Sequence, residues 1–324
     1  MTLPTWLVLL MIVPAFVTAP WYLRHAWKIS RYECFALCAT IAYGMTLEVA
    51  AIRTTEAYDY ANLWVMFGSS PNWVPWAIGV CWAILTYICM RTSDAIGLPW
   101  WQRPLTDGAM ATTIDFMLDP VLSNSHWVSD PGVSCMHDAN PAFGGMGVWT
   151  WCVPNGSTGL WYNVPMANFL GWFYVITFIS LFIRLGRRYL GADSRGWLAQ
   201  LGLAIGAALL AFGACYVAGT LLSANRIGVT GEWIVVGALF AVVIAGIIVQ
   251  RRQLKFSNRL QPAVYMWPVT VYVACPVLFF AKRIDESSWP MSALVMLVVI
   301  ATGILGLLLP SIGAFRSASR RGAA

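Results

Sequence analysis

Charged residues are scarce in this sequence, and their scarcity excludes a soluble fold. Of the 324 residues only 10% are Asp, Glu, Lys or Arg, whereas 59% are hydrophobic. Soluble domains carry about a quarter charged residues, because water must solvate their surface. The composition therefore predicts an integral membrane protein whose solvent is lipid.

Several catalytic and targeting signals are also missing. The sequence has no phosphate-binding glycine loop, nucleophile elbow, dinucleotide-binding fingerprint or zinc-protease helix. It has no internal repeat, which argues against a transporter built from two related halves. No basic segment precedes the first apolar run, so we expect a retained anchor and not a cleaved signal peptide.

What the sequence does contain is a series of apolar runs that can cross about 30 Å of hydrocarbon. Many of its Trp and Tyr residues fall near the ends of these runs, where such rings anchor helices at the headgroups. We expect a single all-α membrane domain over 1–324, a polytopic helical bundle of about nine transmembrane helices. They are placed at roughly 3–22, 34–52, 72–90, 108–122, 164–183, 197–222, 232–250, 263–281 and 291–312.

The basic residues predict the orientation, because cytoplasmic loops retain positive charge. With the N-terminus outside and the C-terminus cytoplasmic, sixteen of the twenty Lys and Arg lie in inner loops, and only Arg53, Arg226, Lys282 and Arg283 lie outside. This distribution predicts a multi-pass protein of the cell membrane. It also explains the net charge of +6 without a nucleic-acid partner.

The longest connection, at about 123–163, is expected on the non-cytoplasmic side. It contains Asp130 and Asp138 but no Lys or Arg, and a connection of this length is usually functional. It also holds His126, Cys135, His137 and Cys152. Their spacing fits no zinc signature, so a metal site is the less favoured alternative to a disulfide between Cys135 and Cys152, which an oxidising exterior permits.

Three carboxyl groups lie in apolar runs. Ionisable groups are costly at membrane depth, so each of the three is expected to have a function. Glu48, Asp115 and Asp119 are all placed in the outer leaflet by this topology. The two aspartates are four residues apart, which puts them on one face of a helix. Two such groups do not both ionise readily in an apolar site, so one is expected to keep its proton and act as an acid.

Simpler interpretations of these polar residues stay open. Asp119 precedes Pro120, where helices commonly end, so it is also explained as a solvated helix terminus. Glu48 is also explained as a partner of Arg53 at the interface. Asn168 either orients a water or a carboxyl group, or caps the helix that follows Pro165.

Aromatic residues gather on the same side of the predicted membrane. The candidate substrate-binding residues are Trp149, Trp151, Trp161, Tyr162 and Trp172, with Phe169 and Phe173 nearby. The face of such a ring stabilises a desolvated cation by about 0.5 to 2 kcal/mol. A carbocation site needs this lining, and the alternative is an aromatic belt at the headgroups.

Three sequence blocks resemble one family. The blocks are 114–121 (IDFMLDPV), 148–151 (VWTW) and 161–173 (WYNVPMANFLGWF), and Glu48 with the segment 58–87 is similar more loosely. Together they resemble the bacterial and archaeal membrane carotenoid hydratases, the "carotenoid biosynthesis protein" family. The resemblance covers roughly residues 40 to 175. Two features depart from the family pattern, namely a longer connection between Pro120 and Trp149, and Asn163 where the family commonly has Gly.

The resemblance implies a lyase that adds water to the terminal double bond of an acyclic carotenoid or related isoprenoid, giving a tertiary alcohol without a cofactor or metal. In this hypothesis Asp115 or Asp119 protonates the alkene, and a water positioned by Glu48 or Asn168 captures the cation. The substrate reaches the site from the bilayer. The alternative is a membrane terpene cyclase, which uses the same acid but quenches the cation with an internal alkene or by proton loss.

The topology yields a direct test. A reporter that is active only in the external compartment, fused after Arg321, is expected to stay silent, because the C-terminus is predicted inside. The same reporter placed in the 123–163 connection is expected to be active. Activity of the fusion after Arg321 would reverse the orientation and move the acidic residues to the cytoplasmic leaflet.

Overall fold

The computed structural model describes residues 5–55, 57–61, 63, 65–69, 72–123, 148–152, 159–252, 254, 266–282 and 291–303. Within these ranges the chain is mostly helical. The helices are α1 (Thr5–Ile29), α2 (Arg31–Thr55), α3 (Trp76–Ile96), α4 (Arg103–Ser123), α5 (Met166–Tyr189), η2 (Ala192–Ser194), α6 (Trp197–Leu221), α7 (Ala224–Gln250), α8 (Met266–Lys282) and α9 (Met291–Gly303). Four short strands accompany them, β1 (Tyr58–Tyr60), β2 (Met66–Phe67), β3 (Val74–Pro75) and β4 (Trp149–Trp151).

Each predicted span overlaps an α-helix of the described residues, which confirms the helical architecture. Within the described part of the chain, five helical segments are long and apolar enough to cross a membrane, namely Arg31–Thr55, Trp76–Ile96, Met166–Tyr189, Trp197–Leu221 and Asn225–Gln250. Helix α4 does not reach that hydropathy because it carries Arg103 and three aspartates. The membrane character is therefore supported, and the count of nine crossings stays a prediction.

The helix boundaries follow local sequence signals. Helices α3 and α5 begin directly after Pro75 and Pro165, whose extended backbone lies just outside the helix. Helix α3 ends at Gly97 with a φ of 75°, a left-handed cap that glycine adopts without strain. Helix α4 does not end at Asp119 but continues through Pro120 to Ser123.

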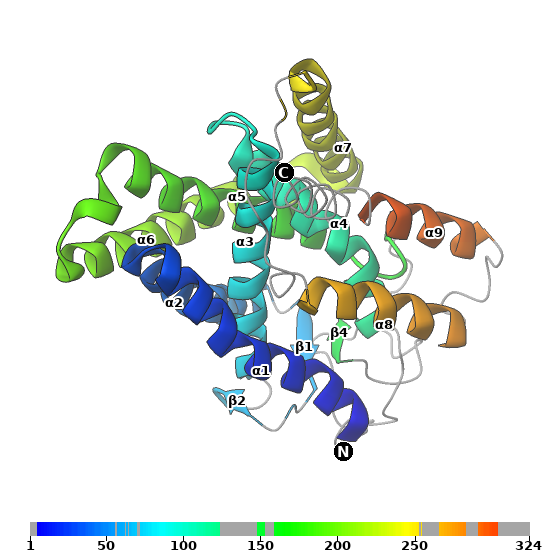
Figure 1. The fold of residues 1–324 in the computed structure, drawn as a ribbon. Helices are drawn as coiled ribbons and strands as arrows, with labels where there is room; N and C mark the ends of the chain where they lie inside the picture. Colours follow the sequence, from blue (N-terminus) through cyan, green and yellow to red (C-terminus); the bar gives the residue numbers. More distant parts are fainter. Residues whose placement is uncertain are drawn as a thin grey trace, which may run out of the picture.

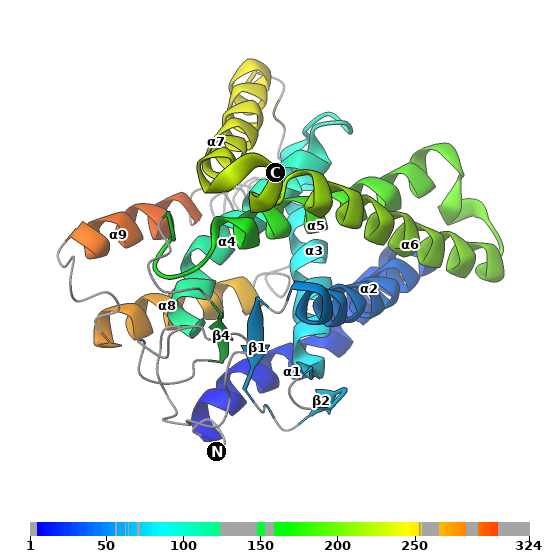
Figure 2. The same cartoon turned by 180° about the vertical axis from the view of Figure 1, so that it is seen from behind.

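The helices divide into a buried centre and more exposed apolar flanks. In α3 83% of the apolar window is buried, whereas in α6 and α7 the buried share is 22% and 17%. Figures 1 and 2 show α3, α4 and α5 in the middle, with α6 and α9 on opposite flanks. Strands β1 and β4 lie side by side at one end of this centre, beside α8.

Helices α4 and α5 pack closely at Gly108. A Cβ added there would lie 2.5 Å from the carbonyl oxygen of Phe173, so no larger residue fits. One turn further along, the Thr112 hydroxyl reaches the carbonyl oxygen of Phe169 at 3.5 Å. This approach places the first turn of α5 against the aspartates of α4.

Gly108→Ala is therefore expected to destabilise the protein by about 1 to 3 kcal/mol through overpacking. The matched control is Gly206→Ala on α6, where an added Cβ meets no described atom within 4 Å. That change is expected to stabilise the helix slightly, because Ala is the better helix former. The measurement is thermal unfolding in detergent, and equal melting temperatures for the two variants would contradict the close packing.

Candidate active site

A two-stranded antiparallel sheet carries four aromatic side chains of the site. Strands β1 and β4 pair with Tyr58 opposite Trp151 and Tyr60 opposite Trp149. Side chains alternate along a strand, so all four rings project from one face, while Asp59 and Thr150 project from the other. The rings contact each other, with centroids 4.8 Å apart for Tyr58 and Trp151 and 5.9 Å apart for Tyr60 and Trp149.

The two tyrosines donate to Glu48 of α2. The Tyr58 and Tyr60 hydroxyls donate to Oε2 of Glu48 at 2.5 and 2.9 Å. The indole N–H of Trp82, on α3, donates to Oε1 at 2.7 Å. Glu48 is only 8% exposed, and three donors stabilise a negative charge on its carboxylate.

Gly44 makes room for this arrangement. A Cβ at this position of α2 would lie 2.7 Å from the Cβ of Trp82. The Trp82 ring then stacks at a tilt on Trp172 of α5, with centroids 4.4 Å apart. The glycine therefore brings α3 close enough for the indole N–H to reach Glu48.

The two tryptophans of β4 donate to Asp119 of α4. The indole N–H groups of Trp149 and Trp151 both reach Oδ1 of Asp119, at 2.8 and 2.7 Å. The other carboxyl oxygen, Oδ2, accepts a hydrogen bond from the Asn168 amide at 2.8 Å. Asp119 is 2% exposed, so its interpretation as a solvated helix terminus is wrong.

Asn168 joins the two aspartates. Its amide also donates to Oδ2 of Asp115 at 2.6 Å. Asp115 is fully buried, and its Oδ1 has no hydrogen-bond partner among the described residues. Asn168 thus lies inside α5 as a bridge between carboxyl groups and not as the helix cap, which is Pro165.

These clusters face one cavity of about 110 Å³. Its polar lining consists of Glu48, Tyr58, Tyr60, Trp82, Asp119, Trp149, Trp151 and Asn168. Its apolar wall is formed by Pro14, Ile78, Cys81, Leu85, Leu118, Leu122, Trp172, Val271, Ala274, Cys275 and Leu278. The cavity therefore combines two carboxyl groups on opposing clusters with an apolar wall from α1, α3, α4, α5 and α8.

Three predicted site residues do not line this cavity. Asp115 is outside the cavity lining, and it accepts a hydrogen bond from Asn168, which lines the cavity. The indole N–H of Trp161 donates to the carbonyl oxygen of Phe116 at 2.9 Å, and Tyr162 packs edge-on against Phe279. Trp161 and Tyr162 therefore shape the turn before α5, where Asn163 has a φ of 66°, a conformation that Asn and Gly adopt most readily.

The candidate ligands of the outer loop fall mostly outside the described residues. These are His126, Cys135 and His137. Cys152 is disulfide-bonded, and the role of Cys135 as its partner stays a prediction. Among the residues that the structure describes, no group of three His, Cys, Asp or Glu side chains is arranged to hold a metal ion.

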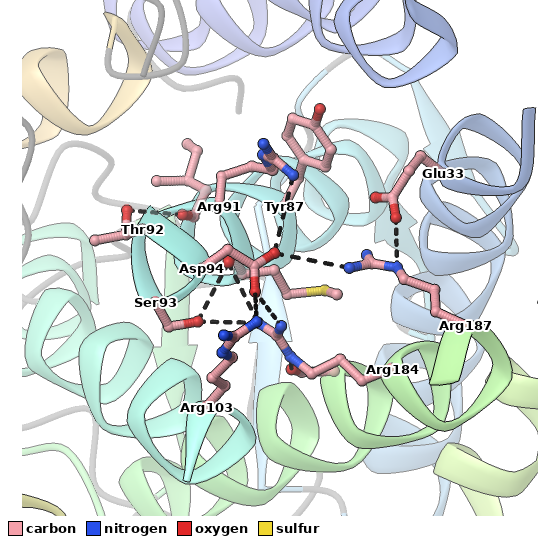
Figure 3. A network of polar contacts seen from close by, with 12 residues as sticks. Glu33, Tyr87, Arg91, Thr92, Ser93, Asp94, Arg103, Arg184 and Arg187 are labelled. Carbon is pink, nitrogen blue, oxygen red and sulfur yellow. Dashed lines mark hydrogen bonds and ion pairs between the residues drawn. The ribbon is translucent and has the colours of Figure 1, made fainter. Parts of the chain in front are cut away.

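A second buried polar cluster lies at the other ends of the same helices (Figure 3). Arg184 of α5 pairs with Asp94 of α3 and, at 2.9 Å, with Asp107 of α4. Arg103 also reaches Asp94 at 2.9 Å, and Arg187 reaches Glu33 of α2 at 2.5 Å. The arginines of this cluster belong to the set predicted to be cytoplasmic.

Sequence reasoning missed two groups of these residues. The donors to Glu48 were missed because Tyr58 and Tyr60 lie between the predicted spans at 34–52 and 72–90, where no strand was predicted. Aromatic residues two apart, repeated in Trp149 and Trp151, are the signal that indicates paired strands. The ion cluster was missed because Asp107 and Arg184 directly flank predicted spans, and charged residues are common at the ends of spans.

The sequence matches no model of a known family, no curated protein and no solved structure.

Arg184 is expected to be indispensable for folding. Arg184→Met leaves Asp94 and Asp107 buried without their main cation, which costs about 3 to 5 kcal/mol. The control is Arg188→Met in the same helical turn, an exposed side chain that lies over the Trp100 ring at 5.1 Å and contributes about 0.5 to 1 kcal/mol. Folded yield and unfolding temperature in detergent are the measurements, and similar values for the two variants would contradict the role of the cluster.

Proposed function

We propose that this protein is a membrane-embedded hydratase that adds water to the terminal double bond of an acyclic carotenoid or related isoprenoid. The product is a tertiary alcohol. The observation that carries the proposal is Asp119, a buried carboxyl group that faces an apolar cavity and is held by three N–H donors.

Asp119 is the proton donor in this proposal, and Asp115 is not. Of the two, only Asp119 lines the cavity. In its neutral form, Oδ1 is the carbonyl oxygen that accepts both indole N–H groups, and Oδ2 carries the proton. The N–H donors stabilise the carboxylate that remains after transfer, so they strengthen the acid.

The cation that follows protonation finds two kinds of support. In this proposal Glu48 is the ionised carboxyl group, because its three donors stabilise a carboxylate on the cavity wall. Trp82, Trp172 and the strand tryptophans line the same cavity, and a ring whose face meets a desolvated cation stabilises it by about 0.5 to 2 kcal/mol. An alkene without charge enters this apolar site more readily than a polar substrate.

The cavity size favours hydration over cyclisation. An apolar cavity of about 150 Å³ holds one benzene molecule, so a cavity of about 110 Å³ suits the five carbons of one terminal isoprene unit. A cyclase must enclose two folded isoprene units. The terpene cyclase therefore stays the second candidate.

The membrane context agrees with such a substrate. We infer nine crossings of the cell membrane, with the N-terminus and the site on the non-cytoplasmic side. A carotenoid is too apolar to leave the bilayer, and helices α1 and α8, which form part of the cavity wall, lie outside the central helices α3, α4 and α5 (Figure 1). The proposed reaction needs only water and a proton.

Expression in a lycopene-producing host tests the proposal. Hydration is expected to add the mass of one water for each end group. An unchanged mass with altered chromatographic retention would indicate cyclisation instead. Recovery of unmodified lycopene alone, from cells that contain the folded protein, would contradict both candidates.

Asp119→Asn is expected to lower product formation on the order of 100-fold or more, the usual contribution of a general acid. The amide has the same volume but cannot donate the proton. Asp115→Asn is expected to have a smaller effect, because Asp115 acts through Asn168. Asp193→Asn, an exposed residue of η2, is the control, and normal turnover by Asp119→Asn would remove Asp119 from the mechanism.

A further inference from the structure

We infer that the Tyr58 hydroxyl relays a proton from the attacking water to the Glu48 carboxylate, and so captures the cation as an alcohol. This inference rests on the proposed hydration and names the base that the reaction needs. Protonation of the alkene is only half of the reaction. The water that attacks the cation must also lose a proton, and the acid cluster around Asp119 is filled with donors.

The contacts of Tyr58 suit a relay. Its hydroxyl donates to Oε2 of Glu48 at 2.5 Å, and the side chain lines the cavity. A hydroxyl has two acceptor lone pairs besides its donor, so the oxygen can still accept a hydrogen bond from a water in the cavity. Glu48 at the far end of the relay is 8% exposed and has both oxygens engaged by side-chain donors.

The phenol must be neutral for this role. Burial and the adjacent Glu48 carboxylate hold the pKa of Tyr58 well above its ordinary value. The same causes raise the pKa of Tyr60. Both groups therefore stay protonated at neutral pH and donate to Glu48, and neither is itself a phenolate base.

The step balances in atoms and charge. Asp119 gives its proton to the CH carbon of the terminal alkene, which leaves a tertiary cation and an aspartate. The water oxygen bonds to the cation. One water proton passes to the Tyr58 oxygen while the phenol proton passes to Glu48. The products are the alcohol, neutral Glu48 and ionised Asp119, and cavity water returns the proton from Glu48 to Asp119.

Both tyrosines lie between the two carboxyl clusters, and Tyr58 is favoured over Tyr60 by its shorter contacts with each. Its hydrogen bond to Glu48 is the shorter of the two. Its ring lies 4.8 Å from that of Trp151, whereas the Tyr60 ring lies 5.9 Å from that of Trp149, and both tryptophans donate to Asp119. Tyr60 is only 4% exposed. Tyr60 therefore orients Glu48, and Tyr58 faces the place where the cation forms.

The experiment measures how the cation is quenched. The full-length protein, in membranes with lycopene and D₂O, is assayed for alcohol and for deuterium in the recovered alkene. Deuterium enters the alkene when Asp119 delivers a deuteron and the cation then loses a proton. Tyr58→Phe is expected to lower the ratio of alcohol to labelled alkene at least tenfold, and Tyr60→Phe to lower it less.

The matched control is Tyr43→Phe, which removes a buried hydroxyl that donates to the carbonyl oxygen of Val175 at 3.0 Å, outside the cavity. Its ratio is expected to equal that of the wild type. Because the ratio is taken between products of the same active molecules, a low folded yield does not change it. If Tyr58→Phe gives no product of either kind, Glu48→Gln is measured in the same way and is expected to lower the ratio.

The outcomes separate the relay from the proposed function. An unchanged ratio in Tyr58→Phe, or a larger fall in Tyr60→Phe, would overturn the relay while the hydration stands. A wild-type protein that yields neither alcohol nor labelled alkene would overturn the hydration itself. Alcohol and label in the wild type, with the alcohol alone lost in Tyr58→Phe, would support both.

Discussion

The structure depends on supplying hydrogen-bond donors to carboxyl groups that are buried away from water. A carboxyl group at membrane depth costs about 2 to 3 kcal/mol or more without partners. Asp119 and Glu48 each accept three side-chain hydrogen bonds. Four of these six donors come from the β1–β4 sheet, so a pair of three-residue strands makes the whole arrangement possible.

The helices that hold this site are fixed at their opposite ends by charge. On α4 the site residue Asp119 lies twelve positions after Asp107 of the ion cluster, about 18 Å along the helix at 1.5 Å per residue. Arg184 and Asn168 lie at opposite ends of α5 in the same way. The buried Arg184 therefore fixes how far α3, α4 and α5 are shifted along their axes relative to one another. The donors and acceptors of the site come within hydrogen-bond distance only when the helices have these axial positions.

Hydropathy in the sequence approximately placed the α-helices that the structure describes, and charge inside apolar runs singled out Glu48 and Asp119. Asn168 was singled out as a polar residue at the start of an apolar run. These predictions depend on the cost of burying polar groups. A polar residue inside an apolar run can be recognised from its neighbours in the sequence alone. The partners of Glu48 were not predictable in this way, because Tyr58 and Trp82 reach it through a strand pairing and a close helix approach at Gly44. The aromatic residues of the turn before α5 show the opposite error, since adjacency in sequence suggested that Trp161 lines the cavity.

The proposed hydration requires a neutral Asp119 opposite an ionised Glu48. Infrared difference spectroscopy of the protein in lipid measures this most directly, because a protonated carboxyl group has its own C=O stretching band, which shifts in D₂O. Asp119→Asn is expected to remove a component of that band, and Glu48→Gln is expected to leave the band intact. Loss of the band in Glu48→Gln, with no change in Asp119→Asn, would contradict the assignment of acid and base.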